Sequence, residues 1–326
     1  MNFLVIGGAG FIGAYVTRTL LAQGHKVVVY DMSLAENTLG KVLSAEELEK
    51  ITMVSGDVTD LAGLIRAIRE NDIDSLVHLA YWQIPASNNN PHKAIEINAL
   101  GFNNTLEAMA SLNLKRLVWT SSNAVFGSPK YQPVTPLPND AIQKPNLVYG
   151  ALKSLNEFMA EHYYTHRGVD SIGVRLCLVY GYGRMRGAST FASDMIVNAA
   201  LGEPCVIDNG DSEVDWYYVE DAAQLIAHAL TAPTPPRRIY NANSDVQTVR
   251  HAAGMLAEMI PDTKLDVKEG ALDANWDLDS SLMEEELGFK PKYSLDEGLK
   301  DFVYQVREKA GLEVIPGTES IRHYEN

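Results

Sequence analysis

Two residues in the middle of the chain have the types and the spacing for proton transfer to or from an alcohol. Tyr149 and Lys153 stand four positions apart at the start of a helical pattern that reaches about residue 166, so one helical face carries both. A free tyrosine, whose pKa is about 10, is a poor base at neutral pH. A nearby ammonium lowers that pKa, and the phenolate can then take a proton from a substrate hydroxyl.

A serine precedes this pair at the end of an apolar segment. Residues 117–120 read as a buried strand that ends at Ser121 and Ser122. The Ser122 hydroxyl is therefore placed to bond the same substrate oxygen that Tyr149 deprotonates. A Tyr-x-x-x-Lys pair alone occurs often by chance on surface helices. The order of serine, tyrosine and lysine after a cofactor-binding segment is much more specific.

The cofactor-binding segment is the first stretch of the chain. Residues 3–6 are apolar, the glycine-rich turn 7–13 follows, and a helical pattern covers 14–23. This order of strand, glycine turn and helix is typical of a dinucleotide-binding corner. Glycine permits the sharp turn, the close approach of a pyrophosphate and tight packing of the helix on the sheet. We expect the helix N-terminus to face the phosphates, with cofactor contacts from Gly7, Gly10, Phe11, Ile12 and Gly13.

Asp31 indicates which dinucleotide is bound. It ends the second apolar run, 27–30, eighteen residues after Gly13. A carboxylate at this position accepts hydrogen bonds from the ribose hydroxyls of adenosine and repels a 2′-phosphate. Since no Arg or Lys follows it closely, the sequence favours NAD over NADP.

Further cofactor contacts are expected after the next strands. Asp57 and Val58 follow the strand pattern 51–54; Asp57 either holds the adenine amino group or caps the helix from Leu61, and both interpretations stay open. The strand pattern 75–78 runs into small apolar residues that would let a cofactor lie against them. Asn98 lies inside a helix expected over 91–110 and is a candidate cofactor contact, although such an Asn often bonds backbone. The candidates from these strands and this helix are Asp57, Val58, Leu79, Ala80 and Asn98.

The alternation of strands and helices predicts an α/β fold, a Rossmann-type doubly wound parallel sheet with a smaller C-terminal substrate-binding lobe. We assign residues 1–176 to the NAD-binding domain and 177–326 mainly to the lobe, with about 214–245 expected to return to the domain. In the lobe we expect a loop over 179–188 and a hairpin or loop over 210–216.

The composition is that of a soluble globular protein, with 46% hydrophobic and 21% charged residues among 326. A net charge of −15 argues against nucleic acid and anionic membranes as partners. The cysteines, Cys177 and Cys205, form no CxxC motif or disulfide framework, the strand at residue 3 leaves no room for a signal peptide, and no metal-ligand pattern is evident. We expect a cytoplasmic protein that acts on a small molecule.

At this point the chain resembles an extended short-chain dehydrogenase/reductase of the NAD-dependent epimerase/dehydratase family, over nearly its whole length. The resemblance implies that Ser122, Tyr149 and Lys153 are catalytic and that Lys153 bonds the nicotinamide ribose. It also implies a homodimer formed through helices 98–112 and 149–166. The shared motifs are Gly7-x-x-Gly10-x-x-Gly13, Asp31, Asp57-Val58, His78-Leu-Ala, Ser121-Ser122-x-x-Val-Phe-Gly127, Tyr149-x-x-x-Lys153, Arg175-x-x-x-Val-Tyr-Gly181 and Val219-Glu-Asp221.

Departures from the family pattern narrow the function. Asn123 and Ala124 stand where family dehydratases carry an Asp-Glu pair, so dehydration lacks its acid and base. Leu178 and Val214 stand where nucleotide-sugar members usually carry an Asn and an Arg that bind the diphosphate. We therefore expect a substrate that is not an activated sugar bound in the usual way.

The expected substrate contacts are Trp82 after the fourth strand, Ser122, Asn123, and Arg184 and Arg186 in the loop after the sixth strand. An arginine there can bind a carboxylate or phosphate, or it can simply face solvent. The first functional hypothesis is an NAD-dependent dehydrogenase that oxidises a secondary hydroxyl of a sugar acid or polyhydroxy compound. The alternatives are an NAD-dependent epimerase that keeps its cofactor and a non-catalytic NAD-sensing protein.

Overall fold

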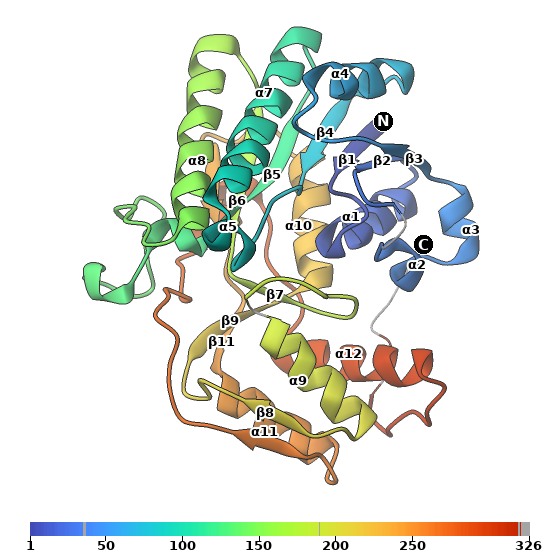
Figure 1. Cartoon of the computed structure of the whole chain (residues 1–326), viewed down its shortest axis with the longest axis vertical. Helices are drawn as coiled ribbons and strands as arrows, with labels where there is room; N and C mark the ends of the chain where they lie inside the picture. The colour runs from blue at the N-terminus through green and yellow to red at the C-terminus, as the bar shows by residue number, and fades with distance from the viewer. Residues whose placement is uncertain (35–36, 189, 319, 321–326) are drawn as a thin grey trace.

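The central sheet of the computed structural model follows the predicted doubly wound plan (Figure 1). The structure describes residues 1–34, 37–188, 190–318 and 320. Within them, seven parallel strands lie in the order β10-β6-β5-β4-β1-β2-β3. The order reverses between β1 and β4, which is where such sheets bind ligands, beyond the carboxyl ends of the strands. The strands are β1 (Asn2–Ile6), β2 (Lys26–Asp31), β3 (Thr52–Ser55), β4 (Ser75–His78), β5 (Leu117–Ser122), β6 (Ser171–Leu176) and β10 (Ile239–Asn241).

Helices cover both faces of this sheet because successive strand residues point to opposite sides. In β1, Phe3 and Val5 pack with α1 and α10, whereas Leu4 and Ile6 pack with α4, α7 and α8. Figure 1 shows α7 and α8 side by side and α1 next to α10. These helices are α1 (Phe11–Ala22), α4 (Leu61–Glu70), α7 (Gly101–Leu112), α8 (Val148–Arg167) and α10 (Val219–Thr231).

The helix expected over 91–110 is not α-helical throughout, because its middle part is π-helical. It consists of α6 (Pro91–Ala94), a π-helical segment η1 (Ile95–Leu100) and then α7. The widened turn places Asn98 inside the protein, where its side chain bonds the backbone of Trp82. Short helices elsewhere are α2 (Leu39–Val42), α3 (Ala45–Glu49), α5 (Ala86–Asn89), η2 (Asn123–Phe126) and η3 (Pro129–Tyr131).

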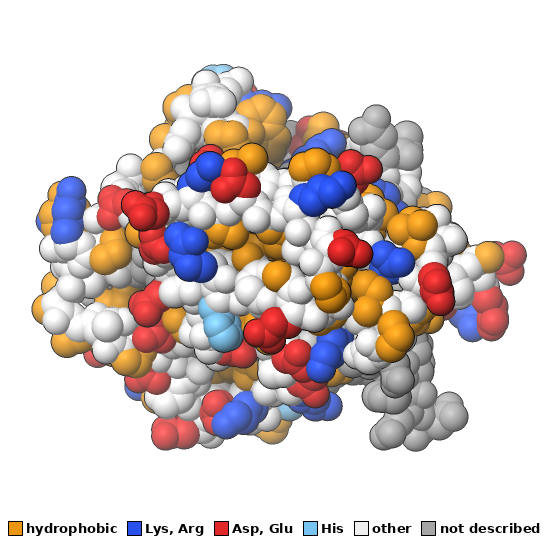
Figure 2. Space-filling view, turned by 90° about the horizontal axis from the view of Figure 1, so that it is seen from below, with side chains coloured by type: hydrophobic (Ala, Val, Ile, Leu, Met, Phe, Trp, Pro, Cys, Tyr) orange, Lys and Arg blue, Asp and Glu red, His pale blue; other side chains and the backbone are white. Residues whose placement is uncertain are grey.

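The lobe lies below the sheet in Figure 1. The loop expected over 179–188 begins inside strand β7, and the segment 210–216 contains the start of β9; β9 pairs with β7 and β11. Figure 2, which looks at the molecule from the lobe side, shows acidic and basic side chains interspersed on that face. The lobe elements are β7 (Leu178–Tyr180), α9 (Thr190–Leu201), β8 (Cys205–Ile207), β9 (Glu213–Tyr218), β11 (Asp245–Thr248), α11 (Val249–Met259), β12 (Leu265–Val267), η4 (Met283–Leu287) and α12 (Leu295–Lys309).

The chain returns from the lobe to the central sheet. β10 pairs with β6, and α10 packs against α1, where Arg18 and Glu220 form a buried ion pair. Among the described residues, no helix has the length and apolar character to cross a membrane.

Candidate active site

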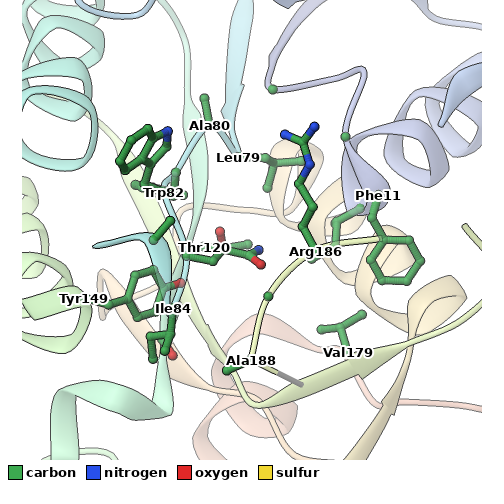
Figure 3. A pocket seen from close by; sticks show the side chains of 18 of the residues that line it. Phe11, Leu79, Ala80, Trp82, Ile84, Thr120, Tyr149, Val179, Arg186 and Ala188 are labelled. Atoms are coloured by element: carbon green, nitrogen blue, oxygen red, sulfur yellow. The ribbon is translucent and has the colours of Figure 1, made fainter. Parts of the chain in front are cut away.

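A cavity of about 1200 Å³ opens at the carboxyl ends of β1, β2, β4, β5 and β6. The loop 183–188 and the lobe segment 272–276 complete its wall. In Figure 3, Trp82, Ile84 and Tyr149 lie on one side, Phe11 and Arg186 on the other, and Thr120 between them. The cavity therefore joins the predicted cofactor end to the predicted catalytic residues.

The glycine turn has the close packing that a phosphate-binding corner needs. Gly7 has φ +79°, and an added Cβ would lie 2.7 Å from the backbone nitrogen of Ala80. A Cβ on Gly13 would lie 2.4 Å from the carbonyl oxygen of Gly7. Helix α1 starts at Phe11 with no acidic residue in its first turn. Its free amides and positive end can accept the pyrophosphate of a dinucleotide, so these residues fit NAD.

Asp31 and Asp57 both line the cavity next to this turn. The Asp31 carboxylate accepts hydrogen bonds from the amides of Ala9 at 3.2 Å and Ser33 at 3.1 Å. Asp57 accepts two bonds from Thr59, through its amide at 2.9 Å and its hydroxyl at 2.8 Å. Asp57 thus stabilises its own turn and also faces the cavity. It can therefore still be either a contact for the adenine amino group or a cap of the helix that begins at Leu61.

The other predicted cofactor contacts divide into two groups. Gly10, Ile12, Val58, Leu79 and Ala80 line the cavity with the residues named above. Asn98 and Lys153 are not among the described residues that line it. The Asn98 amide is instead paired with the backbone of Trp82, which is the structural alternative considered for it.

Tyr149 and Ser122, two of the predicted catalytic residues, lie at one end of the cavity. Both line the cavity; the Ser122 hydroxyl donates to Oδ1 of Asn123 at 3.1 Å and lies near enough to Tyr149 to influence its pKa as a hydrogen-bond partner. Burial raises the pKa of Tyr149 to about 12, while the Arg184 guanidinium and the bond with Ser122 act in the opposite direction. In this state Tyr149 is a phenol, and added positive charge is needed to make it a base.

Lys153 lies one helical turn away and is fully buried. Its Nζ donates to the carbonyl oxygen of Thr120 at 2.5 Å and lies 5.5 Å from the centroid of the Tyr149 ring. Burial lowers the pKa of Lys153 well below its usual value, and the Glu157 carboxylate opposes that change. The nearest aromatic face belongs to Tyr81, whose ring centroid is 2.8 Å from Nζ.

Glu157 is a buried residue that the sequence interpretation missed. It forms a bidentate pair with Arg175, with both distances 2.8 Å, and accepts a bond from Ser121 at 2.5 Å. It stands four residues after Lys153, so helical spacing could have indicated it. This network connects α8 to β5 and β6.

All five expected substrate contacts line the cavity. Arg184 is half-buried; its Nη1 donates to the carbonyl of Val179, and its guanidinium carbon lies 5.8 Å from the centroid of the Phe11 ring. Burial lowers the pKa of Arg184 to about 10, while Tyr149 and Asp194 raise it. Asn123 donates to the carbonyl of Asn275 at 2.6 Å. Arg186 is exposed at the rim.

The lobe contributes a part of the wall that no motif indicated. Leu272, Asp273, Ala274 and Trp276 line the cavity. Asp273 accepts a bond from the Ser128 hydroxyl at 2.5 Å. These residues lie more than a hundred positions after Tyr149 in the sequence, and their segment has no periodicity that would have indicated that it lines the cavity.

Leu178 and Val214, the positions that depart from the family pattern, are fully buried in the lobe core. Neither is among the described residues that line the cavity. Trp216 is also buried there, with its indole bonded to the carbonyl of Gln247 at 3.1 Å. These three side chains therefore belong to the hydrophobic core.

The comparisons with known proteins agree with this geometry. A UDP-glucose 4-epimerase of Lactobacillus helveticus is 27% identical, with 90% of this chain and 93% of that protein aligned. The crystal structure of Thermus thermophilus UDP-glucose 4-epimerase with NAD has a TM-score of 0.80 at 26% identity, covering 94% and 99% of the two chains.

The similarity extends to dehydrogenases. The L-threonine dehydrogenase of Clostridium difficile has a TM-score of 0.81 at 25% identity, covering 94% of this chain and 98% of that one. The model of the NAD dependent epimerase/dehydratase family matches residues 3–242. The predicted fold, family and cofactor are confirmed: the chain belongs to the NAD-dependent epimerase/dehydratase family.

Proposed function

We propose that the protein is an NAD-dependent dehydrogenase that oxidises a secondary hydroxyl of a small non-nucleotide substrate, such as a sugar acid or polyhydroxy compound. The observation that carries this proposal is the placement of Ser122 and Tyr149 together on the cavity wall, with Lys153 one turn behind and Arg184 close by. These groups supply a base and an orienting donor at the cavity wall, with one guanidinium beside them and one ammonium behind them.

Each residue has a distinct task in this mechanism. NAD, when bound, supplies the two-electron acceptor and would be held by the glycine turn, Asp31, Leu79 and Ala80. Tyr149 takes the proton of the substrate hydroxyl. Ser122 donates a hydrogen bond to the same oxygen and orients it. The Lys153 ammonium favours the phenolate form of Tyr149.

The substrate end favours an anionic compound with an apolar part. Arg184 and Arg186 are the cationic side chains among the described residues that line the cavity, and Asp31, Asp57 and Asp273 are the anionic ones. Asp31 and Asp57 belong to the cofactor end. A guanidinium near Tyr149 can bind a substrate carboxylate through paired hydrogen bonds, while Trp82 and Asn123 line the space around it.

An epimerase that retains its cofactor is the second candidate, favoured by the relatives that carry that name. It would use the same three residues. A panel of uronic acids, aldoses, hydroxy acids and nucleotide sugars, incubated with purified protein and NAD+, separates the two. A dehydrogenase releases NADH, seen as net absorbance at 340 nm, whereas an epimerase inverts its substrate with no net NADH. Inversion without NADH release would overturn the proposal.

We also propose a cytoplasmic homodimer. Both cysteines are free thiols, as in a reducing compartment. On α8, Phe158 is 67% exposed and Leu155 is 43% exposed, beside α7. These apolar side chains support pairing through α7 and α8. Light scattering with Phe158→Glu tests it: the variant should be monomeric, and a monomeric unmodified protein would refute it.

A further inference from the structure

Tyr81 occupies a place in the site that the proposed mechanism does not use. It follows β4, lines the cavity and turns the face of its ring toward Lys153, with Nζ 2.8 Å from the ring centroid. An ammonium within about 6 Å of an aromatic face is attracted by the ring quadrupole. Lys153 is fully buried and is not among the described residues that line the cavity. The Tyr81 ring therefore contacts the ammonium and lines the cavity as well.

The ring, and not the hydroxyl, makes this contact. The Tyr81 hydroxyl is buried and has no hydrogen-bond partner among the described residues. The ring packs against His78 and Phe102, with centroid distances of 4.8 and 6.5 Å. The backbone beside it is fixed, because Asn98 bonds both the N–H and the carbonyl of Trp82. The side chain thus packs against two aromatic rings, next to a fixed backbone, while its ring face contacts Lys153.

The surroundings of Lys153 explain why a ring face matters there. On α8, Tyr149 and Glu157 face it; on β5, the Thr120 carbonyl accepts a hydrogen bond from its Nζ at 2.5 Å. On β4, His78 is fully buried, and burial together with Lys153 lowers its pKa to about 3, so it is neutral. Burial disfavours the ammonium form. Glu157, the Thr120 carbonyl and the ring of Tyr81 favour it.

We propose that Tyr81 is a positioning residue whose ring face holds Lys153 as an ammonium beside Tyr149. This proposal rests on the proposed function, in which that ammonium favours the phenolate of Tyr149. No bond forms or breaks at Tyr81. Its effect passes entirely through Lys153.

Titration of the Lys153 ammonium tests the contact without requiring any enzyme activity. The 15N signal of Nζ is assigned with Lys153→Arg and followed against pH in the full chain. Tyr81→Phe keeps the ring and should leave the titration unchanged. Tyr81→Leu should lower the midpoint by about one pH unit, a tenfold loss of proton affinity, because the ring no longer stabilises the cation.

A graded series guards against a Leu variant that does not fold. Phenylalanine, its 4-fluoro form and its 3,4,5-trifluoro form at position 81 have nearly the same size but a progressively weaker negative ring face. We expect the Lys153 midpoint to fall in that order. The same midpoint across the series, or a loss with Tyr81→Phe as large as with Tyr81→Leu, would overturn the proposal.

The pH profile of turnover connects the contact to chemistry. With any substrate found in the panel, the acid limb of kcat/KM should move to higher pH along the fluorinated series, because a less cationic Lys153 raises the pKa of Tyr149. A moving Lys153 titration with an unmoved acid limb would overturn the role of Tyr81 in catalysis. The protein could also be inactive on every substrate while the Lys153 midpoint still falls along the fluorinated series. That result would count against the proposed function and not against the contact between the residue 81 ring and Lys153.

Discussion

Asn98 and Trp82 are joined by two hydrogen bonds that run in opposite directions. The Trp82 amide donates to Oδ1 of Asn98 over 2.7 Å, and Nδ2 of Asn98 donates to the Trp82 carbonyl over 2.8 Å. Asn156 in α8 donates to the carbonyl of Asn98 over 2.9 Å. The segment after β4 is thereby tied to the π-helical turn and to the helix that carries Tyr149.

Asn98→Leu should therefore destabilise the protein. Two backbone groups of Trp82 would lose their partners, at about 1 to 3 kcal/mol for each group that stays buried. Urea denaturation measures the loss, and calorimetry should show weaker NAD binding because Trp82 lines the cavity. Asn103→Ala is the control, since the Asn103 side chain accepts a 3.2 Å bond from the Tyr163 hydroxyl and, among the described residues, bonds no backbone group of Trp82. An Asn98→Leu variant as stable as the control would contradict this account.

Asp31 should set the preference for NAD+ over NADP+. Its carboxylate lies at the cavity next to the glycine turn, where it would meet a 2′-phosphate at close range. We expect the protein to bind NAD+ much more tightly than NADP+. In Asp31→Ala, the dissociation constants of the two dinucleotides should be closer to each other. Asp57→Asn serves as the control and should change both constants by the same factor. Equal or tighter binding of NADP+ to the unmodified protein would refute the assignment.

Tyr149→Phe should abolish proton transfer and leave the cofactor site intact. The substitution keeps the ring and removes the hydroxyl that meets Ser122. We expect kcat to fall by roughly 10²-fold or more, with the dissociation constant of NAD little changed. Lys153→Ala should impair both turnover and cofactor binding. Near-normal turnover by Tyr149→Phe in stopped-flow assays would show that another group is the base.

Arg184 should influence the pH dependence of turnover. Its guanidinium lowers the pKa of Tyr149, which burial has raised to about 12. Arg184→Met removes that cation, so the pKa of Tyr149 rises and the phenolate forms only at higher pH. The acid limb of kcat/KM should shift upward by about 0.5 to 1 pH unit. Arg186→Met, at the exposed rim, should leave the limb in place; a downward shift in Arg184→Met would be inconsistent with this role.

UDP and UDP-glucose should bind weakly. The family resemblance places Leu178 and Val214 where nucleotide-sugar members usually carry diphosphate ligands, and both side chains are buried in the lobe core. A pyrophosphate without partners would cost several kcal/mol. Calorimetry should detect no displacement of substrate by millimolar UDP, with adenosine diphosphate ribose as a positive control for the NAD end of the cavity. Tight UDP binding would restore the epimerase hypothesis.

Local patterns were sufficient to predict the sheet and its helices. The apolar runs around Val5, Val28 and Val77 became β1, β2 and β4 because each is buried on both faces. The glycine turn was also readable, since Gly7 and Gly13 sit where a Cβ would collide with backbone. These features depend on neighbours in sequence or on steric rules that hold for any chain.

The strands of the lobe and the contacts that Tyr81 and Asp273 make could not be predicted from local sequence patterns. β7 has only three residues and exists because it pairs with β9, far away in sequence. The contact of Tyr81 with Lys153 joins two elements more than seventy positions apart. Asp273 reaches the cavity from a segment with no regular pattern. Such placements depend on tertiary packing, and the roles assigned to the individual site residues stay predictions.

Because α10 and β10 return to the central sheet after the first lobe segment, the chain cannot be cut into two folded fragments at the end of β6. A fragment ending at residue 176 would lack β10 and α10, which pair with β6 and pack on α1. The edge of β6 would then offer unpaired backbone groups, and the apolar side of α1 would meet water. Such a fragment should aggregate when expressed alone. An autonomous cofactor module would need residues 219–241 spliced directly after β6, with the lobe segments on both sides of 219–241 removed.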